Sequence, residues 1–498
     1  MSRAVTRSGR ITHARILCVL FVAAFLIRFL YARADPFLHN WDERFHALVA
    51  RNLMHDPFKP MLIANPIAAY DFKDWTGNHI WLHKQPLFMW QMAASMKIFG
   101  VSELTLRLPN VFMGSLMVLM LFRVSYLFTA NTTISVLAAT LLCFSHYHLE
   151  LIGALRSMDH NDVALGFYVL ASIWAYVEYQ RYKLWYWAVL AGGLAGCAIL
   201  NKWLVGLAVF LGWGVNLLSA MREKSLRRDA GHFLLALLVC CFVFVPWQVY
   251  ITHKWPEEAR YEYETNNRHL SEAIEGHGGT VWYYAESVPD YFGKYLWVFI
   301  PVGVGLAASS RTTDRRLLLP FLGIVTFVFC VFSFAVKTKM DSYVFFVVPL
   351  CMIFLAFGLA EVCRRAGSRW IWALTFLVSI YLSFVPKRIL GYLSTENAER
   401  NQRIATTRVL RDLKATLPAD VRVVLNTNEF ENLDLMFYNN DLTAYPRISE
   451  SELQALSRRN VRVAAFKSGG RHDLPAYVST YPLLYVIDKG YAFRDVPY

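Results

Sequence analysis

Two acids in the first long polar segment have the position and the chemistry of a catalytic base. Trp41 and Phe45 are among the apolar residues that fall on one helical face here, which predicts a short amphipathic helix at the membrane surface, with Asp42 and Glu43 in its first turn. A carboxylate held there could take a proton from an incoming hydroxyl. Helix capping by Asn40 and the helix dipole explain the same acids equally well. From spacing alone, both interpretations stay open.

A lysine precedes the next predicted helix. Pro86 suits the first helical position and the residue before a proline is extended, so His83 and Lys84 lie just outside the helix N-terminus. Free N–H groups at such an end attract anions, which makes Lys84 a candidate phosphate ligand and His83 a further candidate beside it. Lys84 could equally be a lysine that extends its ammonium to the lipid interface.

Two further acids, Asp159 and Asp162, precede an apolar run that begins at Val163. Acids next to a membrane span usually face water or a cavity, because placing one in lipid costs about 2.5 to 3.5 kcal/mol. Each of them is therefore a candidate catalytic acid, and each could also only cap the helix. Lys202 interrupts two apolar runs and is either a ligand or a loop cation that sets the topology.

The remaining candidates lie in a second polar segment and at a span boundary. Arg268 and His277 belong to the segment 252–290, whose glycines suit a lid that closes over a substrate, although a solvated loop would look similar. His277 has no partner at metal-ligand spacing, so the sequence supports no metal site. Lys339 and Tyr343 either bind phosphate or anchor a helix end at the membrane interface.

Apolar runs near twenty residues must position these groups. The chain has 498 residues, of which 56% are hydrophobic and 17% charged, and this balance excludes a disordered chain and disfavours a soluble enzyme. About eleven runs have the length that a bilayer core of about 30 Å selects. They are 16–31, 108–128, 133–150, 163–179, 184–200, 204–220, 232–251, 291–308, 317–336, 343–362 and 370–386. The sequence therefore predicts an α-helical polytopic membrane protein.

The basic residues predict its orientation. Arginines and lysines precede the first span and then cluster in alternate loops, which places the N-terminus in the cytoplasm and the segments 32–107 and 252–290 outside. This placement accounts for most of the net charge of +13, and no motif typical of nucleic-acid binding is present. The eight cysteines lie in or beside the spans, so neither a disulfide framework nor a cysteine metal site is indicated.

The tail has a different character from the membrane part. We expect a membrane domain over residues 1–386 and an external α/β domain over residues 387–498. A polar helix is predicted at 396–417 and strands at 421–425, 461–466 and 483–488. Ser449 and Glu452 form a capping box that opens a short helix.

Together these motifs resemble the GT-C glycosyltransferases that use polyprenyl-phosphate sugars, especially the aminoarabinose transferase and protein O-mannosyltransferase branch. The resemblance covers the whole membrane region and the external tail. It rests on the order and sidedness of Asp42-Glu43, Lys84-Gln85-Pro86-Leu87, the acid before the span at 163, Asn201-Lys202, Asn267-Arg268, and Lys339 with Tyr343.

The resemblance implies an enzyme that carries a sugar from a polyprenyl (undecaprenyl) phosphate to an envelope lipid, glycan or protein. It implies Asp42 as the base, and Lys84, Arg268, Lys339 and Tyr343 as ligands of the lipid phosphate. It also implies a multi-pass protein of the bacterial inner membrane, with the active site and the tail in the periplasm. The family commonly has an acid and then Lys-Pro-Pro where this chain has His83-Lys84-Gln85-Pro86, so a divalent metal at that acid is not supported here.

Two other classes of protein compete with an enzyme. A transporter or flippase of similar span number would concentrate ionisable residues near the bilayer midplane and often show inverted repeats, whereas here the charges gather at the external ends and no repeat is evident. A scaffold would depend on its tail and tolerate changes at Asp42 and Lys84. The sequence names neither the sugar nor the acceptor.

Overall fold

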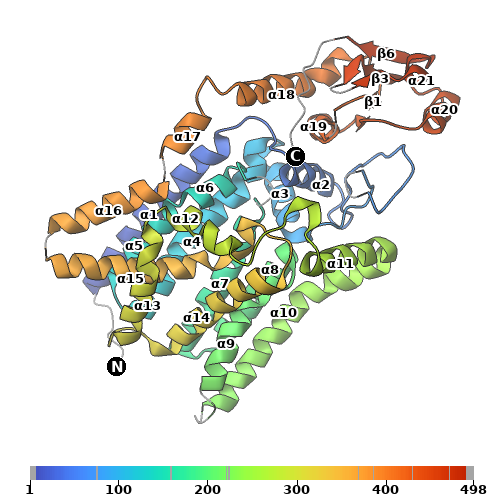
Figure 1. The fold of residues 1–498 in the computed structure, drawn as a ribbon. Coiled ribbons are helices and arrows are strands. Elements are labelled where there is room, and N and C mark those ends of the chain that lie inside the picture. The colour runs from blue at the N-terminus through green and yellow to red at the C-terminus, as the bar shows by residue number, and fades with distance from the viewer. Residues whose placement is uncertain are drawn as a thin grey trace. The chain divides into compact units, whose positions relative to one another are not determined.

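The computed structural model describes residues 7–74, 77–156, 160–219, 221, 225–367, 369–384, 386–428, 430–469 and 472–488 (Figure 1). The chain forms two compact units. The first unit consists of residues 1–32, 84–88 and 107–388, and the second of residues 33–83, 89–106 and 389–498. The first long polar segment and the tail therefore belong to one unit, although more than 280 residues of sequence separate them.

The first unit is helical. Its elements are α1 (Arg7–Arg33), α4 (Glu103–Thr129), α5 (Thr132–Cys143), α6 (His146–Ile152), α7 (Asp162–Tyr182), α8 (Trp185–Lys202), η2 (Trp203–Leu207), α9 (Ala208–Ser219), α10 (Leu226–Lys254), α11 (Pro256–Ser271), η3 (Ile274–Gly276), α12 (Tyr283–Phe292), η4 (Leu296–Val298), α13 (Phe299–Ser309), α14 (Arg315–Cys330), η5 (Val331–Ala335), η6 (Asp341–Val347), α15 (Val348–Ala366), α16 (Arg369–Phe384) and α17 (Pro386–Tyr392). A few of these elements end just inside the second unit.

The helices of this unit confirm a polytopic membrane protein. Among the described residues, six helices are long and apolar enough to cross a bilayer, or up to eight if each of two bent pairs counts as one span. The predicted number of about eleven is not confirmed. The predicted span 163–179 corresponds to α7, most of whose residues are buried. Its Glu178 accepts hydrogen bonds from Arg123 of α4 at 2.6 and 3.0 Å.

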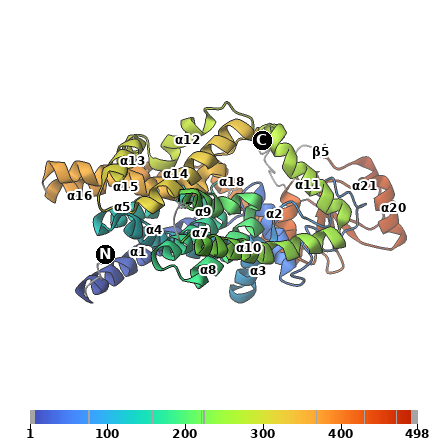
Figure 2. The ribbon, with the colours of Figure 1, turned by 90° about the horizontal axis from the view of Figure 1, so that it is seen from below.

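Two glycines let α8 and α10 pack backbone to backbone. A Cβ atom on Gly192 would lie 2.0 Å from the carbonyl oxygen of Ala236, and one on Gly196 would lie 2.8 Å from that of Cys240. This is the small-residue spacing that membrane helices use for close approach. Figure 2 shows α7, α8 and α10 side by side. The contact fixes α8, the helix that ends at Lys202.

The second unit joins helices of the first polar segment to an α/β tail. Its helices are α2 (Asp42–Leu53), α3 (Pro86–Phe99), α18 (Ala398–Thr416), α19 (Glu431–Tyr438), α20 (Glu450–Arg458) and α21 (Ala476–Ser479), and its strands are β1 (Val423–Leu425), β2 (Thr443–Tyr445), β3 (Val463–Phe466), β4 (Ser468–Gly469), β5 (His472–Asp473) and β6 (Leu484–Ile487). A parallel sheet has the order β2-β1-β3-β6, and β4 pairs with β5 in a separate antiparallel ribbon.

The small α/β character of the tail is confirmed, and its predicted elements are found within a few residues. The predicted polar helix is α18, and the three predicted strands are β1, β3 and β6. Ser449 and Glu452 form the expected capping box at α20. β2 was not predicted, because Thr443–Tyr445 is too short to show alternation. The domain boundary at residue 386 stays a prediction.

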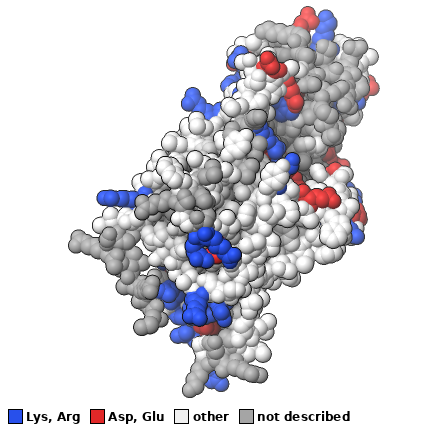
Figure 3. All heavy atoms as spheres, turned by 60° about the vertical axis from the view of Figure 1, so that its left-hand side comes forward, with Lys and Arg blue, Asp and Glu red and all other residues white. Residues whose placement is uncertain are grey.

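Lys and Arg side chains gather in small patches on the face that Figure 3 shows, and most other described residues on that face are uncharged. At the end of α15, Arg364 and Arg365 both pair with Glu361, at 2.6 and 2.9 Å. A surface with few charges, confined to patches, is what a protein with lipid-facing helices requires.

We predict that Gly192→Ala destabilises the protein and Gly193→Ala does not. Alanine favours a helix over glycine by about 1 kcal/mol, but at position 192 its methyl group overlaps the α10 backbone, at a cost of about 1 to 3 kcal/mol. Among the described residues, the nearest atom to a Cβ on the adjacent Gly193 is Cγ1 of Val239, at 3.9 Å. Thermal unfolding in detergent should show a lower Tm for Gly192→Ala alone. Equal Tm values for the two variants would contradict this packing.

Candidate active site

Asp42 and Glu43 begin a buried helix. Asp42 is 8% exposed and Glu43 fully buried, and every residue of α2 except Arg51 is buried. The prediction that this helix lies at the membrane surface is therefore wrong, because protein covers it on all sides. So is the prediction that Asn40 is the N-cap, since Trp41 holds that position and makes no side-chain cap hydrogen bond.

Glu43 stabilises the entry to this helix. Its Oε2 accepts a hydrogen bond from the backbone N–H of His39 at 2.6 Å, as the acid of a capping box does. The ring of His39 lies 3.1 Å from one carboxylate oxygen of Asp35, to which Tyr392 donates a hydrogen bond at 2.7 Å, and Arg400 donates to the other oxygen at 2.7 Å. Burial by itself would raise the pKa of Asp35, but these donors lower it to about 2. The structure thus gives Glu43 a structural task and leaves Asp42, 4.0 Å from His46, as the acid at the helix start.

Lys84 has the predicted position before a helix. Pro86 is the first residue of α3, and Lys84 is half-buried two residues earlier. Gln85, between them, accepts a hydrogen bond from Gln248 of α10 at 2.8 Å, which ties this short segment to the membrane helices of the first unit. His83 belongs to the second unit, where its ring contacts that of Trp81.

Asp162, Lys202 and Tyr343 form one cluster in the first unit. Asp162 starts α7, is 1% exposed, and accepts a hydrogen bond from the Lys202 ammonium at 2.6 Å. The same ammonium lies 4.8 Å from the ring centroid of Tyr343, as in a cation–π contact. Lys202 ends α8 where Trp203 takes a positive φ of 64° and the chain turns into η2. A lysine that could have been a loop cation is therefore held in a fixed position.

Lys339 contacts the end of a helix, in agreement with one of its two predicted roles. Its ammonium donates to three main-chain carbonyl groups, those of Phe332, Ser333 at 2.9 Å and Val336 at 2.6 Å. An ammonium has three protons, so Lys339 here caps the carbonyl groups that end η5. Its backbone N–H donates to the carbonyl of His277 at 2.8 Å, which attaches the second polar segment to this turn.

Arg268 lies apart from these contacts. It is exposed at the end of α11 and pairs with Glu272 one turn later at 2.8 Å. The segment around it is largely helical, and the glycine-containing stretch after η3 is irregular, so the lid stays a prediction. An exposed ion pair is weak, and Arg268 can therefore leave Glu272 for another anion at little cost.

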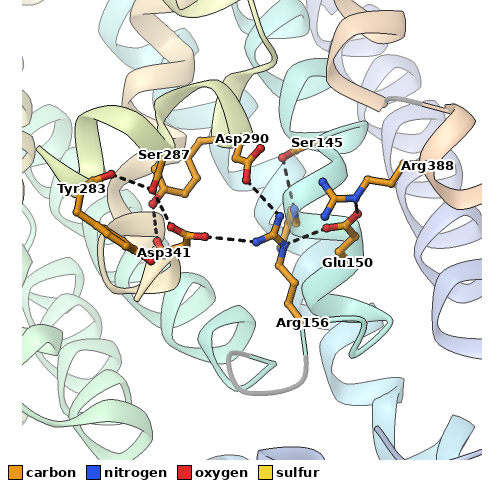
Figure 4. Close-up of polar contacts among 10 residues, drawn as sticks. Ser145, Glu150, Arg156, Tyr283, Ser287, Asp290, Asp341 and Arg388 are labelled. Atoms are coloured by element: carbon orange, nitrogen blue, oxygen red, sulfur yellow. Dashed lines mark hydrogen bonds and ion pairs between the residues drawn. The ribbon is translucent and has the colours of Figure 1, made fainter. Parts of the chain in front are cut away.

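Arg156 organises a cluster that the sequence analysis did not single out (Figure 4). Its guanidinium contacts Glu150 at 2.9 Å and both Asp290 and Asp341 at 3.5 Å, and it lies 4.3 Å from the ring centroid of Tyr147. Burial alone would lower the pKa of Arg156, but the surrounding anionic groups raise it. A single arginine thus joins the loop before α7 to α6, α12 and η6.

The two clusters meet on η6. Asp341, at the start of η6, also accepts a hydrogen bond from Ser287 at 2.7 Å, and its backbone carbonyl accepts one from Tyr291 at 2.6 Å. Tyr343, two residues later, lies against Lys202. Because η6 also packs on α7, its position is fixed from several sides. No motif in the sequence marks Arg156 and Asp341 as partners, because 185 residues separate them.

The structure brings together some of the predicted residues. Asp162, Lys202 and Tyr343 share one cluster, Lys339 and His277 share a backbone contact, and Asp42 and Glu43 open one helix. Asp159 lies outside the described residues, so the choice between Asp159 and Asp162 stays open. Within the described ranges, no group of three or more His, Cys, Asp or Glu side chains has the arrangement of a metal site.

Comparison with known proteins identifies the fold. The family model for dolichyl-phosphate-mannose-protein mannosyltransferase matches residues 50–261. The crystal structure of ArnT from Cupriavidus metallidurans in the apo state superposes with a TM-score of 0.63 at 18% identity, over 90% of this chain and 88% of that one. The chain has the GT-C glycosyltransferase fold. The predicted resemblance is thereby confirmed.

Two further structures agree with a GT-C glycosyltransferase. ArnT from C. metallidurans bound to undecaprenyl phosphate matches with a TM-score of 0.62 at 17% identity, over 90% of this chain and 89% of that one. The oligosaccharyltransferase AglB from Archaeoglobus fulgidus, solved with an inhibitory peptide and dolichol-phosphate, matches with a TM-score of 0.57 at 12% identity, over 88% and 65%. No curated protein matches the chain by sequence. The comparisons support glycosyltransferase activity and do not favour the transporter alternative.

We predict that Asp162→Asn raises the KM for a phosphate-containing donor about tenfold and leaves the pH profile of kcat unchanged. The lost charge-assisted hydrogen bond is worth about 1.5 to 3 kcal/mol, and without it Lys202 is no longer fixed in position. Steady-state kinetics of Asp162→Asn, Lys202→Ala and the double variant test this. The double variant should be no worse than Lys202→Ala, because both changes affect one contact. A collapse of kcat at unchanged KM would instead make Asp162 the base.

Proposed function

We propose that this chain transfers a sugar from a polyprenyl-phosphate carrier, such as undecaprenyl phosphate, to a hydroxyl or phosphate group of an envelope glycolipid, glycan or protein. The observation that carries the proposal is the Asp162–Lys202–Tyr343 cluster, a cation held in place in a membrane fold whose solved neighbours include one with undecaprenyl phosphate and one with dolichol-phosphate. A fixed cation is what a lipid phosphate needs.

Charge explains why such a site would catalyse the reaction. A sugar phosphodiester carries one negative charge, and breaking the glycosidic bond to release polyprenyl phosphate concentrates a second charge on the phosphate. Cations that contact the phosphate therefore stabilise the transition state more than the ground state. The leaving group then needs no general acid, and a carboxylate on the opposite side can take the proton of the attacking hydroxyl. A single displacement of this kind inverts the anomeric carbon.

The residues divide between these two tasks. We assign Asp42 as the base, and Lys84, Lys202 and Tyr343 as the groups that bind the lipid phosphate. Arg268 has only a weak surface pair to give up, so we keep it as a phosphate ligand in the substrate complex. Lys339 would have to give up a carbonyl contact to join them, and we assign it a lesser share of the phosphate binding.

The membrane supplies the setting. We propose that Asp42, Lys84 and the α/β tail lie on the outer face of a bacterial inner membrane, and the basic clusters in alternate loops support the cytoplasmic N-terminus that this requires. The donor lipid and an acceptor of the envelope would meet there. The purified protein in detergent should release sugar from labelled undecaprenyl-phosphate sugar when an acceptor extract is added. A transporter would release none, since no gradient exists in detergent.

We predict that Asp42→Asn folds and inserts but loses transfer activity by a factor of about 10² to 10⁴, the usual contribution of a general base. The amide keeps the shape of the carboxylate and cannot accept a proton. The measurement is the initial rate of sugar transfer at saturating donor. Asp56→Asn, a matched change just after the same helix, should keep the normal rate. A near-normal rate in Asp42→Asn would remove Asp42 as the base.

We predict that Lys84→Ala raises the KM for the donor about tenfold or more, and that Lys84→Arg restores most of the loss. An ammonium in contact with phosphate contributes a charge-assisted hydrogen bond, which the guanidinium can replace. Lys97→Ala removes a lysine from the other end of α3 and serves as the control. An unchanged donor dependence in Lys84→Ala would mean that this lysine only anchors the helix at the interface.

A further inference from the structure

The loop that follows β1 contacts the helix that carries Asp42, and both belong to the second unit. In the sheet order β2-β1-β3-β6, the chain runs outward from β1 to β2 and then returns to β3 on the other side of β1. The carboxyl ends of β1 and β3 form the switch point where parallel α/β sheets present their functional loops. Asn426 holds this edge together, because its side-chain amide donates to the carbonyl of Phe466 at 2.8 Å.

Aromatic packing joins this loop to the start of α2. Phe430, the residue before α19, has its ring centroid 5.4 Å from that of Trp41 and 6.0 Å from that of Phe45. Trp41 precedes Asp42 directly and has φ 62° and ψ −130°, and Phe430 has φ 65°. Non-glycine residues hold such conformations only where the surrounding structure fixes them, at about 1 to 3 kcal/mol each. The two strained residues lie against each other.

A buried ion pair adds to this contact. The guanidinium of Arg44 lies 3.1 Å from the carboxylate of Asp434, and both side chains are less than a tenth exposed. Burial raises the pKa of Asp434 to about 7 although Arg44 and Arg403 lower it, and burial likewise raises the pKa of Glu431 to about 8. Burying these charged groups costs free energy of folding. The contact between α19 and α2 therefore includes a buried polar pair as well as apolar packing.

A third contact lies at the far end of both helices, where the Arg51 guanidinium is 5.8 Å from the ring centroid of Phe437. Contacts along α19 thus match contacts along α2 from its first turn to its last. The tail also anchors the chain that leads into α2, through Arg400 and Tyr392 on Asp35. With the backbone of Trp41 strained, the direction of the Asp42 side chain depends on these contacts.

We propose that α19 of the tail is a positioning element for Asp42, acting through the Phe430 ring on Trp41 and through the Asp434–Arg44 pair. The tail is then part of the catalytic centre, and the strain at Trp41 is maintained by it. Without the Phe430 ring, Trp41 relaxes toward an ordinary conformation and the first turn of α2 frays, so that the carboxylate no longer faces the attacking hydroxyl. The inference rests on the proposed function for the assignment of Asp42 as base.

The test compares Phe430→Ala and Asp434→Asn with Phe430→Tyr and Tyr477→Ala in the full-length protein in detergent. Tyr477 is a half-buried aromatic residue of α21 that hydrogen-bonds to the carbonyl of Ile448 within the tail, so its truncation controls for general loosening of the tail. Two quantities are measured, the transfer kinetics with undecaprenyl-phosphate sugar and the hydrogen exchange of backbone amides in peptides from α2, β1 and β3.

Phe430→Ala and Asp434→Asn should lower kcat about tenfold or more with the donor KM within about twofold of the original. The amides at 42–46 should exchange about tenfold faster, while those of β1 and β3 stay protected, which shows a folded tail. Phe430→Tyr keeps a ring at this site and should retain the original kcat, and Tyr477→Ala should leave the exchange of 42–46 unchanged.

Unchanged exchange at 42–46 in both Phe430→Ala and Asp434→Asn would overturn the inference, and so would an equal loss of kcat in Tyr477→Ala. A protein that transfers no sugar in any variant would refute the proposed function instead. The exchange measurement still decides in that case whether α19 fixes the first turn of α2. Failure of the two proposals can therefore be told apart.

Discussion

A cation that must act next to a lipid phase needs a fixed counter-charge, and the rest of the first unit depends on how this chain meets that need. Lys202 lies between the buried carboxylate of Asp162 and the ring of Tyr343. A lysine has four rotatable bonds and would extend toward water if nothing held it. The ion pair removes this freedom before a substrate arrives, so the phosphate binding that we propose would cost less conformational entropy. Burial of the Asp162 carboxylate in turn reduces the free energy gained on folding.

Contacts among the surrounding helices hold the Asp162–Lys202 pair in position. Because Gly192 and Gly196 let α8 pack closely on α10, they fix the position of α8 along α10. This also fixes the position of Lys202 at the end of α8. Arg156 connects the loop before α7 to η6 through Asp341, and η6 carries Tyr343. Three elements remote in sequence thus reach one point with little freedom left. These ion pairs fix the helices relative to one another, as apolar packing does in the core of a soluble protein. They are needed because the hydrophobic effect does not drive helices together in lipid.

Much of this could be predicted from the sequence, but not all of it. Apolar runs and basic loops indicated the membrane helices, and the tail strands β1 and β3 followed from β-branched runs, because these signals are local. The proline that predicted a helix start at residue 86 is likewise a local signal, and α3 does begin at Pro86. The partners of a charge are not local. Nothing near Lys339 indicated that its protons would be used by backbone carbonyl groups, and nothing near Arg156 pointed to Asp341.

Asp42 and Glu43 are a second case in which the sequence did not indicate the partners of polar residues. Their spacing correctly predicted a helix that starts with two acids, but the amphipathic pattern also placed this helix at the membrane surface, whereas protein covers it. In the structure a polar residue of this helix, Arg44, pairs with Asp434 of the tail, and the tail residue Phe430 packs on the apolar Trp41. Polar residues at helix period therefore indicate a helix without indicating what covers its polar face. Where a second polar segment lies far along the chain, a buried polar contact between the two is the physical alternative to solvent.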